Sequence, residues 1–305
     1  MLEENDKDEK IIEFLENYEY SEALNTFFSL RKDCIGIIDP PIVLEHQILG
    51  NDGNRLPIQD LEMLVKDGEL RKLKVPRSLS YKNITSSIGY SLKSDILRIL
   101  KQRIQENYLN LGNQNQPNGC FLECLFNNEK NNNLLEKVLS LIKENIFQNY
   151  KTIAINNKHL SDYLSLICAQ WKSQYKVCQN HQANFSGDFL LNLLIKFGIL
   201  RSDASDLHSL IFTTPSMGLF IQYLESGNTM IINSLKRSKY KELFEDKLGT
   251  LKLGKSLLPL DFHLRDLHGT GIIKRMVVHN NPTKVCKLCN IIANRRIQKK
   301  RITTR

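Results

Sequence analysis

The sequence lacks any long uncharged apolar run, and it is poor in tryptophan and proline, with 1 and 8 residues among 305. A membrane-spanning helix needs about 20 consecutive apolar residues, so we expect no membrane span. The first twenty residues hold 8 acidic and 2 basic residues. A secretory signal begins with basic residues that lead into an apolar stretch, so we expect no such signal either.

The 7 cysteines are odd in number and irregularly spaced, whereas the disulfide framework of a secreted domain pairs an even number. We expect reduced thiols in a nuclear or cytosolic protein. Cys286 and Cys289 have the spacing of a zinc half-site, but no second pair follows them, and a structural zinc ion needs four ligands. The sequence therefore predicts packing cysteines, with no metal and no cofactor.

The net charge of +9 is unevenly distributed along the chain. From Ile231 to Arg305 there are 18 Lys and Arg residues against 5 Asp and Glu, a balance of +13, so the rest of the chain carries −4. A basic quarter on a nearly neutral body indicates a polyanionic partner, with nucleic acid ahead of an acidic membrane. A solvated charged surface is the plain alternative.

One pattern, L-x-x-L-x-x-x-G-x-[LI], occurs three times, at Leu61–Leu70, Leu191–Leu200 and Leu264–Ile273. Leucines three residues apart mark one face of a short helix. The glycine stands where a helix needs a left-handed residue after its last turn. We therefore expect a short helix that ends with positive φ at each of three glycines: Gly68, Gly198 and Gly271.

Each copy is followed by a segment typical of a two-stranded hairpin and preceded by helical patterns. Hairpins are expected from Glu69–Val75 with Ile84–Leu92, Ile199–Arg201 with Leu207–Thr213, and Ile272–Val278 with Lys284–Leu288. Helices are expected at Pro41–Leu49, Leu160–Ser173, and Leu219–Leu235 running into Lys239–Lys247. This order is the winged-helix plan. The predicted fold is mainly α with small β-hairpins (α+β), arranged as three tandem winged-helix domains.

Composition supplies the remaining boundaries. Asparagine-rich stretches at Asn110–Gly119 and Asn127–Asn133 contain little that could pack, which is typical of a flexible linker. We predict an acidic helical segment over 1–30, winged helices over 31–109, 134–216 and 217–290, an Asn-rich linker or insertion over 110–133, and a basic tail over 291–305.

Two short motifs point toward nucleotide chemistry, and neither has the context that this chemistry needs. Gly249–Ser256 matches a phosphate loop, which requires a buried strand before it and a helix after it. Charged residues precede this match, and Pro259 follows it closely. His263–Asp266 resembles a kinase catalytic loop, but Leu264 interrupts the His-Arg-Asp triplet. The sequence therefore predicts no enzyme.

The C-terminal half carries the series Pro215-x-x-Gly218-x-Phe220-Ile221-x-Tyr223, Gly227, Lys236-Arg237-x-Lys239-Tyr240-x-Glu242-Leu243 and His263-x-x-Asp266-Leu267. By this signature it closely resembles the nuclear serine/threonine-protein kinase 19 family over about Gly187–Leu288, with a weaker likeness over Pro40–Arg98. Despite its name, that family is similar to winged-helix proteins. The resemblance implies a nuclear, chromatin-associated DNA-binding scaffold in transcription-coupled nucleotide excision repair, with RNA polymerase II and repair-complex proteins as partners.

The N-terminus looks like a LisH dimerisation motif, which would imply a homodimer. Its apolar positions are Ile11, Phe14, Leu15, Tyr20, Leu24 and Phe27. It departs from the motif at Glu19 and Ala23. The alternative is an ordinary amphipathic helix pair that caps the first winged helix.

Duplex DNA binding needs cations that reach phosphates from a rigid element. Adjacent strand residues face opposite ways, so we do not expect Lys274 and Arg275 both to contact DNA. No grouping of Asn, Gln and Arg predicts a base sequence, so we expect largely sequence-independent binding. The candidate DNA-binding residues are Lys236, Arg237, Lys239, Lys241, Arg265, Lys274, Arg275, Lys284 and Lys287.

Two other functions stay open at this point. One is a Ser/Thr protein kinase, as the family name says, and the other is a winged-helix scaffold that binds proteins and not DNA. The basic C-terminal quarter disfavours the second. The tail Ala293–Arg305 is typical of a basic arm or a nuclear-import signal, which agrees with a nuclear protein.

Overall fold

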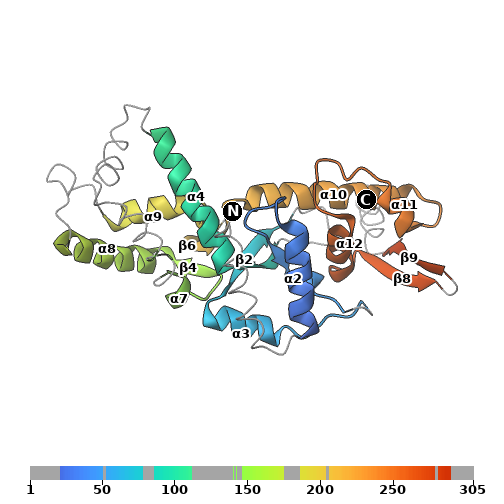
Figure 1. Cartoon of the computed structure of the whole chain (residues 1–305), viewed down its shortest axis with the longest axis horizontal. Helices are drawn as coiled ribbons and strands as arrows, with labels where there is room; N and C mark the ends of the chain where they lie inside the picture. Colours follow the sequence, from blue (N-terminus) through green and yellow to red (C-terminus); the bar gives the residue numbers. More distant parts are fainter. Residues whose placement is uncertain are drawn as a thin grey trace, which may run out of the picture.

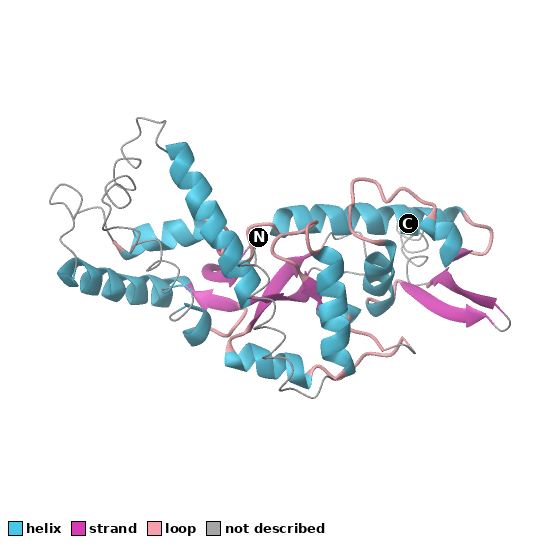
Figure 2. Ribbon diagram, in the orientation of Figure 1, coloured by secondary structure: helices cyan, strands magenta, loops and turns pink. Residues whose placement is uncertain are grey.

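The structure is a computed structural model that describes residues 21–50, 53–77, 86–111, 140, 142, 146–174, 186–203, 206–278 and 281–289. Helices and small antiparallel sheets make up this part of the chain, which confirms the α+β class (Figures 1 and 2). None of the described helices is long and apolar enough to cross a membrane.

The described strands form three sheets, and each sheet has the same organisation. A short early strand pairs with the last strand of the sheet, and that last strand also forms a hairpin with the strand before it. The orders are β1-β3-β2, β4-β6-β5 and β7-β9-β8. The strands are β1 (Val43–Leu44), β2 (Leu70–Pro76), β3 (Ser86–Leu92), β4 (Ala154–Asn156), β5 (Leu200–Asp203), β6 (Asp206–Phe212), β7 (Glu242–Phe244), β8 (Ile273–Val278) and β9 (Asn281–Leu288).

Helices stand before and between the strands of each sheet. The described helices are α2 (Glu22–Cys34), η1 (Glu45–Gln47), α3 (Gln59–Asp67), α4 (Lys93–Leu111), α7 (Phe147–Asn149), α8 (Asn157–Gln174), α9 (Gly187–Lys196), α10 (Met217–Arg237), α11 (Glu245–Gly249) and α12 (Leu260–Gly269). The last helix before each hairpin is therefore α3, α9 or α12, and these are the three helices that the repeated pattern predicts.

The three repeat glycines end these helices in one common way. Their φ angles are +82° at Gly68, +76° at Gly198 and +68° at Gly271, which confirms the prediction of a left-handed residue. In each copy the residue after the glycine donates its backbone amide to the backbone carbonyl of the second leucine of the pattern. The pairs are Glu69 to Leu64, Ile199 to Leu194, and Ile272 to Leu267. This six-residue bond defines a Schellman cap, which turns the chain directly into the hairpin.

Two helix predictions were wrong in part. Pro41–Leu49 forms β1 and η1 instead of one helix, because the β-branched Ile42 and Val43 are buried in extended backbone and the Gln47 side chain accepts the Leu44 amide. The chain after α10 does not continue as a helix through Lys239–Lys247. Ser238 is extended, Lys241 has φ +56°, and β7 and α11 follow.

Several predictions fall on residues that the structure does not describe. Residues 1–20, most of the Asn-rich stretch and the tail lie outside the described ranges. Of the LisH-type positions, Leu24 and Phe27 are described, and both are buried on α2. This helix runs across residue 30, the predicted edge of the N-terminal segment.

The core has two clusters, and α10 joins them. The larger cluster packs residues around the first two sheets together, and it takes Met217, Phe220 and Leu224 from the first half of α10. The smaller cluster lies against the third sheet and takes Ile231, Ile232 and Leu235 from the second half. Figure 1 shows α10 crossing from the middle of the molecule to the third sheet.

Arg71 connects the first two sheets and is itself buried. Its guanidinium donates to the carbonyls of Tyr150 and Thr152, and it lies 3.2 Å from the centroid of the Phe212 ring. Beside it, Lys74 pairs with Asp203 at 2.8 Å. Arg71 and Lys74 are therefore both committed to contacts within the protein.

The caps predict the effect of a β-branched residue at Gly198. A Cβ there would lie 3.1 Å from Pro215 Cα, and the left-handed φ disfavours Val independently of space. Gly198→Val should lower the free energy of unfolding by at least about 1 kcal/mol, measured by denaturant titration. The control is Gly218→Ala, where a Cβ meets no atom within 4 Å and a helical backbone favours Ala, so stability should be unchanged or higher.

Candidate nucleic-acid interface

Helix α12 is the last helix before the third hairpin, where the winged-helix prediction expects a recognition helix, but it faces inward. Its ten residues are buried or partly buried, with His263 and Asp266 fully buried and the Asp261 side chain half-exposed near its N-terminus. It lies against η1 so closely that a Cβ at Gly269 would overlap the His46 carbonyl. The geometry leaves α12 no face with which to enter a DNA groove.

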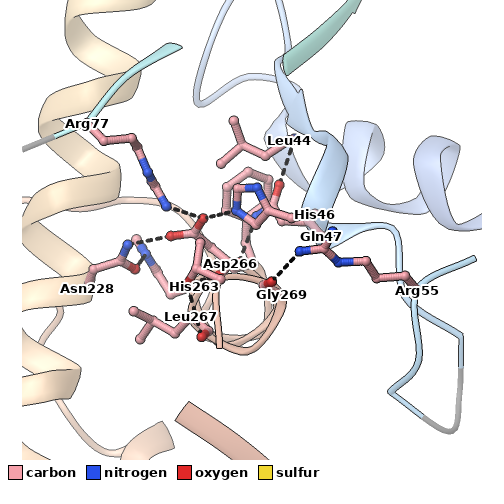
Figure 3. A network of polar contacts seen from close by, with 12 residues as sticks. Leu44, His46, Gln47, Arg55, Arg77, Asn228, His263, Asp266, Leu267 and Gly269 are labelled. Atoms are coloured by element: carbon pink, nitrogen blue, oxygen red, sulfur yellow. Dashed lines mark hydrogen bonds and ion pairs between the residues drawn. The ribbon is translucent and has the colours of Figure 1, made fainter. Parts of the chain in front are cut away.

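The buried carboxylate of Asp266 is the centre of a polar network that joins three elements (Figure 3). Its Oδ1 lies 2.5 Å from His46 Nε2 on η1 and 2.5 Å from a guanidinium nitrogen of Arg77, just after β2. Its Oδ2 accepts from Asn228 Nδ2 on α10, also at 2.5 Å. Asp266 therefore holds α12 to both the first sheet and α10.

Hydrogen bonding fixes the tautomer of His263. Asn228 donates its amide to Asp266, so its Oδ1 must accept, and His263 Nδ1 donates to it at 3.0 Å. The other ring nitrogen, Nε2, then accepts from Ser256 Oγ at 2.8 Å. Ser256 Oγ in turn accepts the Leu258 amide. Each hydrogen bond is therefore donated toward Asp266: Ser256 donates to His263, His263 to Asn228, and Asn228 to Asp266.

Burial and charge set the protonation states. Burial lowers the pKa of His263 to about 4, so this histidine is neutral near pH 7. Burial alone would raise the pKa of Asp266, but the Arg77 guanidinium and the His46 contact outweigh it and hold that pKa below its usual value. The network therefore contains an ionised carboxylate facing a buried guanidinium.

Backbone contacts reinforce the same junction. Gln47 Nε2 donates to the Phe262 carbonyl at 2.9 Å, and Arg55 donates to the Gly269 carbonyl at 3.1 Å. Arg265 donates to the Leu49 carbonyl and pairs with Asp261 at 2.7 Å. The predicted DNA-contacting Arg265 is thus engaged within the protein.

The nucleotide-like motifs are explained by this junction. No helix follows Ser256 directly, and α12 begins only at Leu260. Ser256 is bonded to His263, so the end of the phosphate-loop match lies in the polar network. The letters that resemble a kinase loop are the inward face of α12, and Gly271 is its cap.

Four of the predicted cations are exposed together at the end of α10 and in the turn before β7. Two of them, Lys236 and Arg237, close the last turn of α10. We call this set the α10–β7 basic cluster; its members are Lys236, Arg237, Lys239 and Lys241.

The third sheet separates the remaining cations onto opposite faces. Lys274 and Lys287 are cross-strand partners, are exposed, and share a row with Glu242, which pairs with Lys287 at 3.3 Å. Arg275 faces the other way and makes a bidentate pair with Glu245 at 2.7 and 2.9 Å. The prediction that Lys274 and Arg275 point in opposite directions is confirmed.

The other face of the third sheet is not a free cationic surface. Arg275 also pairs with Asp261 at 2.9 Å. Lys284 is half-buried there and, with Arg265 and Arg275, lines a cavity of about 80 Å³ beside Leu49. The structure thus divides the nine predicted residues into six exposed cations and three at the inward junction.

The cysteines at this sheet have no metal partners among the described residues, where no group of three or more His, Cys, Asp or Glu side chains could hold an ion. Burial raises the pKa of the Cys286 thiol to about 12, so it is not a thiolate near neutral pH.

Loss of charge at Asp266 should destabilise the fold. Asp266→Asn leaves the Arg77 guanidinium buried without its counter-charge, so the free energy of unfolding should fall by about 3 kcal/mol or more. The matched control is Asp261→Asn, which removes a half-exposed carboxylate and should cost under about 1 kcal/mol. Equal effects in denaturant titrations would contradict a special role for the buried network.

His263 should make stability depend on pH. The unfolded chain takes up this proton near pH 6.5 and the folded protein only near pH 4, so stability falls as the pH drops through this window. The loss should approach about 3 kcal/mol at pH 4. In His263→Gln the unfolding free energy should vary less between these values, and a profile parallel to that of the unaltered protein would contradict the assignment.

Comparisons with known proteins identify the family of the chain. A family model described as "Inactive serine-threonine protein kinase 19" matches residues 21–278. The chain is 24% identical over 247 residues to the Dictyostelium discoideum protein named winged helix repair factor 1, which covers 77% of this chain and 56% of that protein. A Xenopus laevis protein of the same name is 31% identical over 81 residues, which cover 26% of this chain and 30% of that protein.

The chain thus spans about half the length of the Dictyostelium protein. The family description agrees with the sequence-based prediction that the protein is not an enzyme. The matched residues include the first two hairpins and β8, and they end before β9. By this match the chain belongs to the inactive serine-threonine protein kinase 19 family.

Proposed function

We propose that the protein is a nuclear DNA-binding scaffold of DNA repair, built from three tandem winged-helix domains. The domains are those that the repeat predicts, over 31–109, 134–216 and 217–290. They are supported by three features that occur in each of the three units: the same strand order, a helix with the same glycine cap, and a hairpin after that helix. The relatives' name, winged helix repair factor, supports both the fold and the process.

The observation that carries DNA binding is the set of six exposed cations around the third sheet. The α10–β7 basic cluster leads through the turn into β7, whose partner strand carries Lys287 and, across from it, Lys274. Only Glu242 lies in this row as a counter-charge. Cations held on a helix end and a sheet are suited to contact successive phosphates.

The mode of binding follows from the burial of α12. In a winged-helix protein the recognition helix reads base edges in the major groove. Here η1 and α10 pack against that helix, so the third domain would contact the backbone and not the bases. We therefore propose largely sequence-independent duplex binding.

The setting within repair is a further part of the proposal. Action in transcription-coupled nucleotide excision repair, with RNA polymerase II and repair-complex proteins as partners, rests on the family resemblance. A homodimer through the LisH-type segment also stays a prediction. The rigid junction between the first and third domains is compatible with a scaffold, since it would hold bound partners in a fixed relation.

Charge reversal in the basic cluster tests DNA binding. A quadruple change of Lys236, Arg237, Lys239 and Lys241 to Glu should weaken binding to unrelated duplex sequences alike, and more than the same change to Ala. Each lost phosphate contact should reduce the slope of log K against log salt by roughly 0.9. Both are measured by fluorescence anisotropy at several salt concentrations.

The matched control reverses four exposed lysines elsewhere, namely Lys32, Lys101, Lys158 and Lys196. It changes the net charge equally, so a specific interface predicts a much smaller effect. Both variants are also measured in a chain that ends at Asn290, because a basic tail binds any polyanion. Unchanged affinity and salt slope in the shortened cluster variant would place the DNA surface elsewhere and favour a protein-binding scaffold.

A further inference from the structure

The turn that carries the basic cluster is held in an uncommon conformation. Lys241 has φ +56°, the one positive φ among the described residues that are not glycine. The Lys241 amide closes the turn on the Ser238 carbonyl at 3.2 Å, and the Lys241 carbonyl accepts from Leu288 on the third sheet at 2.9 Å. Strained backbone conformations that neighbouring hydrogen bonds maintain are concentrated at functional sites.

This turn places an aromatic ring in solvent among cations. Tyr240 is 66% exposed, and Lys239 Nζ lies 5.3 Å from its ring centroid. A second aromatic side chain, Phe244, is 40% exposed two residues into β7, on the sheet face that carries Lys287. Single exposed apolar residues are ordinary, but a fixed tyrosine within a cluster of four cations is a chemically specific surface.

The chemistry of this surface matches a nucleotide. The cations can contact phosphates, while the open face of an aromatic ring can stack on a base. Lys239 over the other face increases the attraction through a cation–π contact. Because the turn is tied to α10 and β9, little conformational freedom would be lost on binding.

We propose that Tyr240 stacks on an unpaired base, so that the site binds DNA in which a single-stranded segment adjoins duplex. This deepens the proposed function and rests on it, since the same cations would hold the phosphates. Bases inside a duplex already stack on one another and offer no free face to Tyr240. The tyrosine should therefore add affinity only where bases are unpaired.

Four labelled DNA probes separate base stacking from phosphate contact. They are a blunt duplex, the same duplex with a single-stranded overhang, a single strand, and a single strand of the same length whose sugars lack bases. Full-length protein and three variants, Tyr240→Ala, Tyr240→Phe and Tyr240→Leu, are titrated with each at one salt concentration.

Tyr240→Ala should bind the overhang and the single strand about 5- to 160-fold more weakly, the range given by stacking energies for one base. It should bind the blunt duplex and the base-free strand as the unaltered protein does. Tyr240→Phe should retain full affinity because it keeps the ring, while Tyr240→Leu should behave like the Ala variant. The thermal midpoint of each variant should be unchanged, since the side chain is mostly exposed.

Two results would overturn the stacking proposal while leaving DNA binding intact. One is equal affinity of Tyr240→Ala and the unaltered protein for all four probes. The other is an equal loss on all four, which would mean that the tyrosine only shapes the cationic turn or serves a protein partner. If the unaltered protein binds none of the probes, the proposed function itself fails.

Discussion

A single ionised carboxylate inside the protein determines how the parts of this molecule are held. Asp266 is fully buried, and a buried charge is costly unless opposite charge and hydrogen bonds compensate for it. Its compensation comes from Arg77 beside the first sheet, His46 on η1 and Asn228 on α10. If any of these elements moved away, the carboxylate would lose a partner without gaining water. The first sheet, α10 and α12 therefore form one arrangement.

This arrangement explains why the third sheet would meet DNA in an unusual way. With α12 turned inward, the surface that remains is the end of α10, the turn before β7 and one face of the sheet. These places carry cations and aromatic rings, which are groups that recognise phosphates and base faces more than base edges. The same constraint that removes sequence readout from α12 also makes the remaining surface rigid.

The sequence predicted the features that are decided locally. A leucine pattern three residues apart, a glycine and an extended run are enough to specify a capped helix and a hairpin, and all three copies have them. The α3, α9 and α12 helices were found in this way. Alternation along a strand likewise separated Lys274 from Arg275. Such patterns act over a few residues and do not depend on the rest of the chain.

The junction itself could not be predicted, because its partners are far apart in the sequence. His46 and Asp266 are 220 residues apart, and Arg77 and Asp266 are 189 apart. Nothing in the letters around His46 or Arg77 indicates a buried ion pair. The sequence marks His263 and Asp266 as part of the family signature and by their likeness to a kinase loop, where such residues would serve catalysis. Here both side chains bond to Asn228 inside the protein, His263 as a donor and Asp266 as an acceptor, so their hydrogen bonds serve the fold.

Burial also changes what a count of basic residues means. The C-terminal quarter has a charge balance of +13, which suggests a uniformly cationic surface. Two of its arginines, Arg265 and Arg275, instead neutralise Asp261 and Glu245 at the junction. A cation that already has an acidic partner releases few counterions on binding DNA, since its pairing must first be broken. In the proposed complex with DNA, the exposed lysines and Arg237 around the third sheet would therefore contribute to affinity and its dependence on salt, while the paired arginines contribute to the fold that positions them.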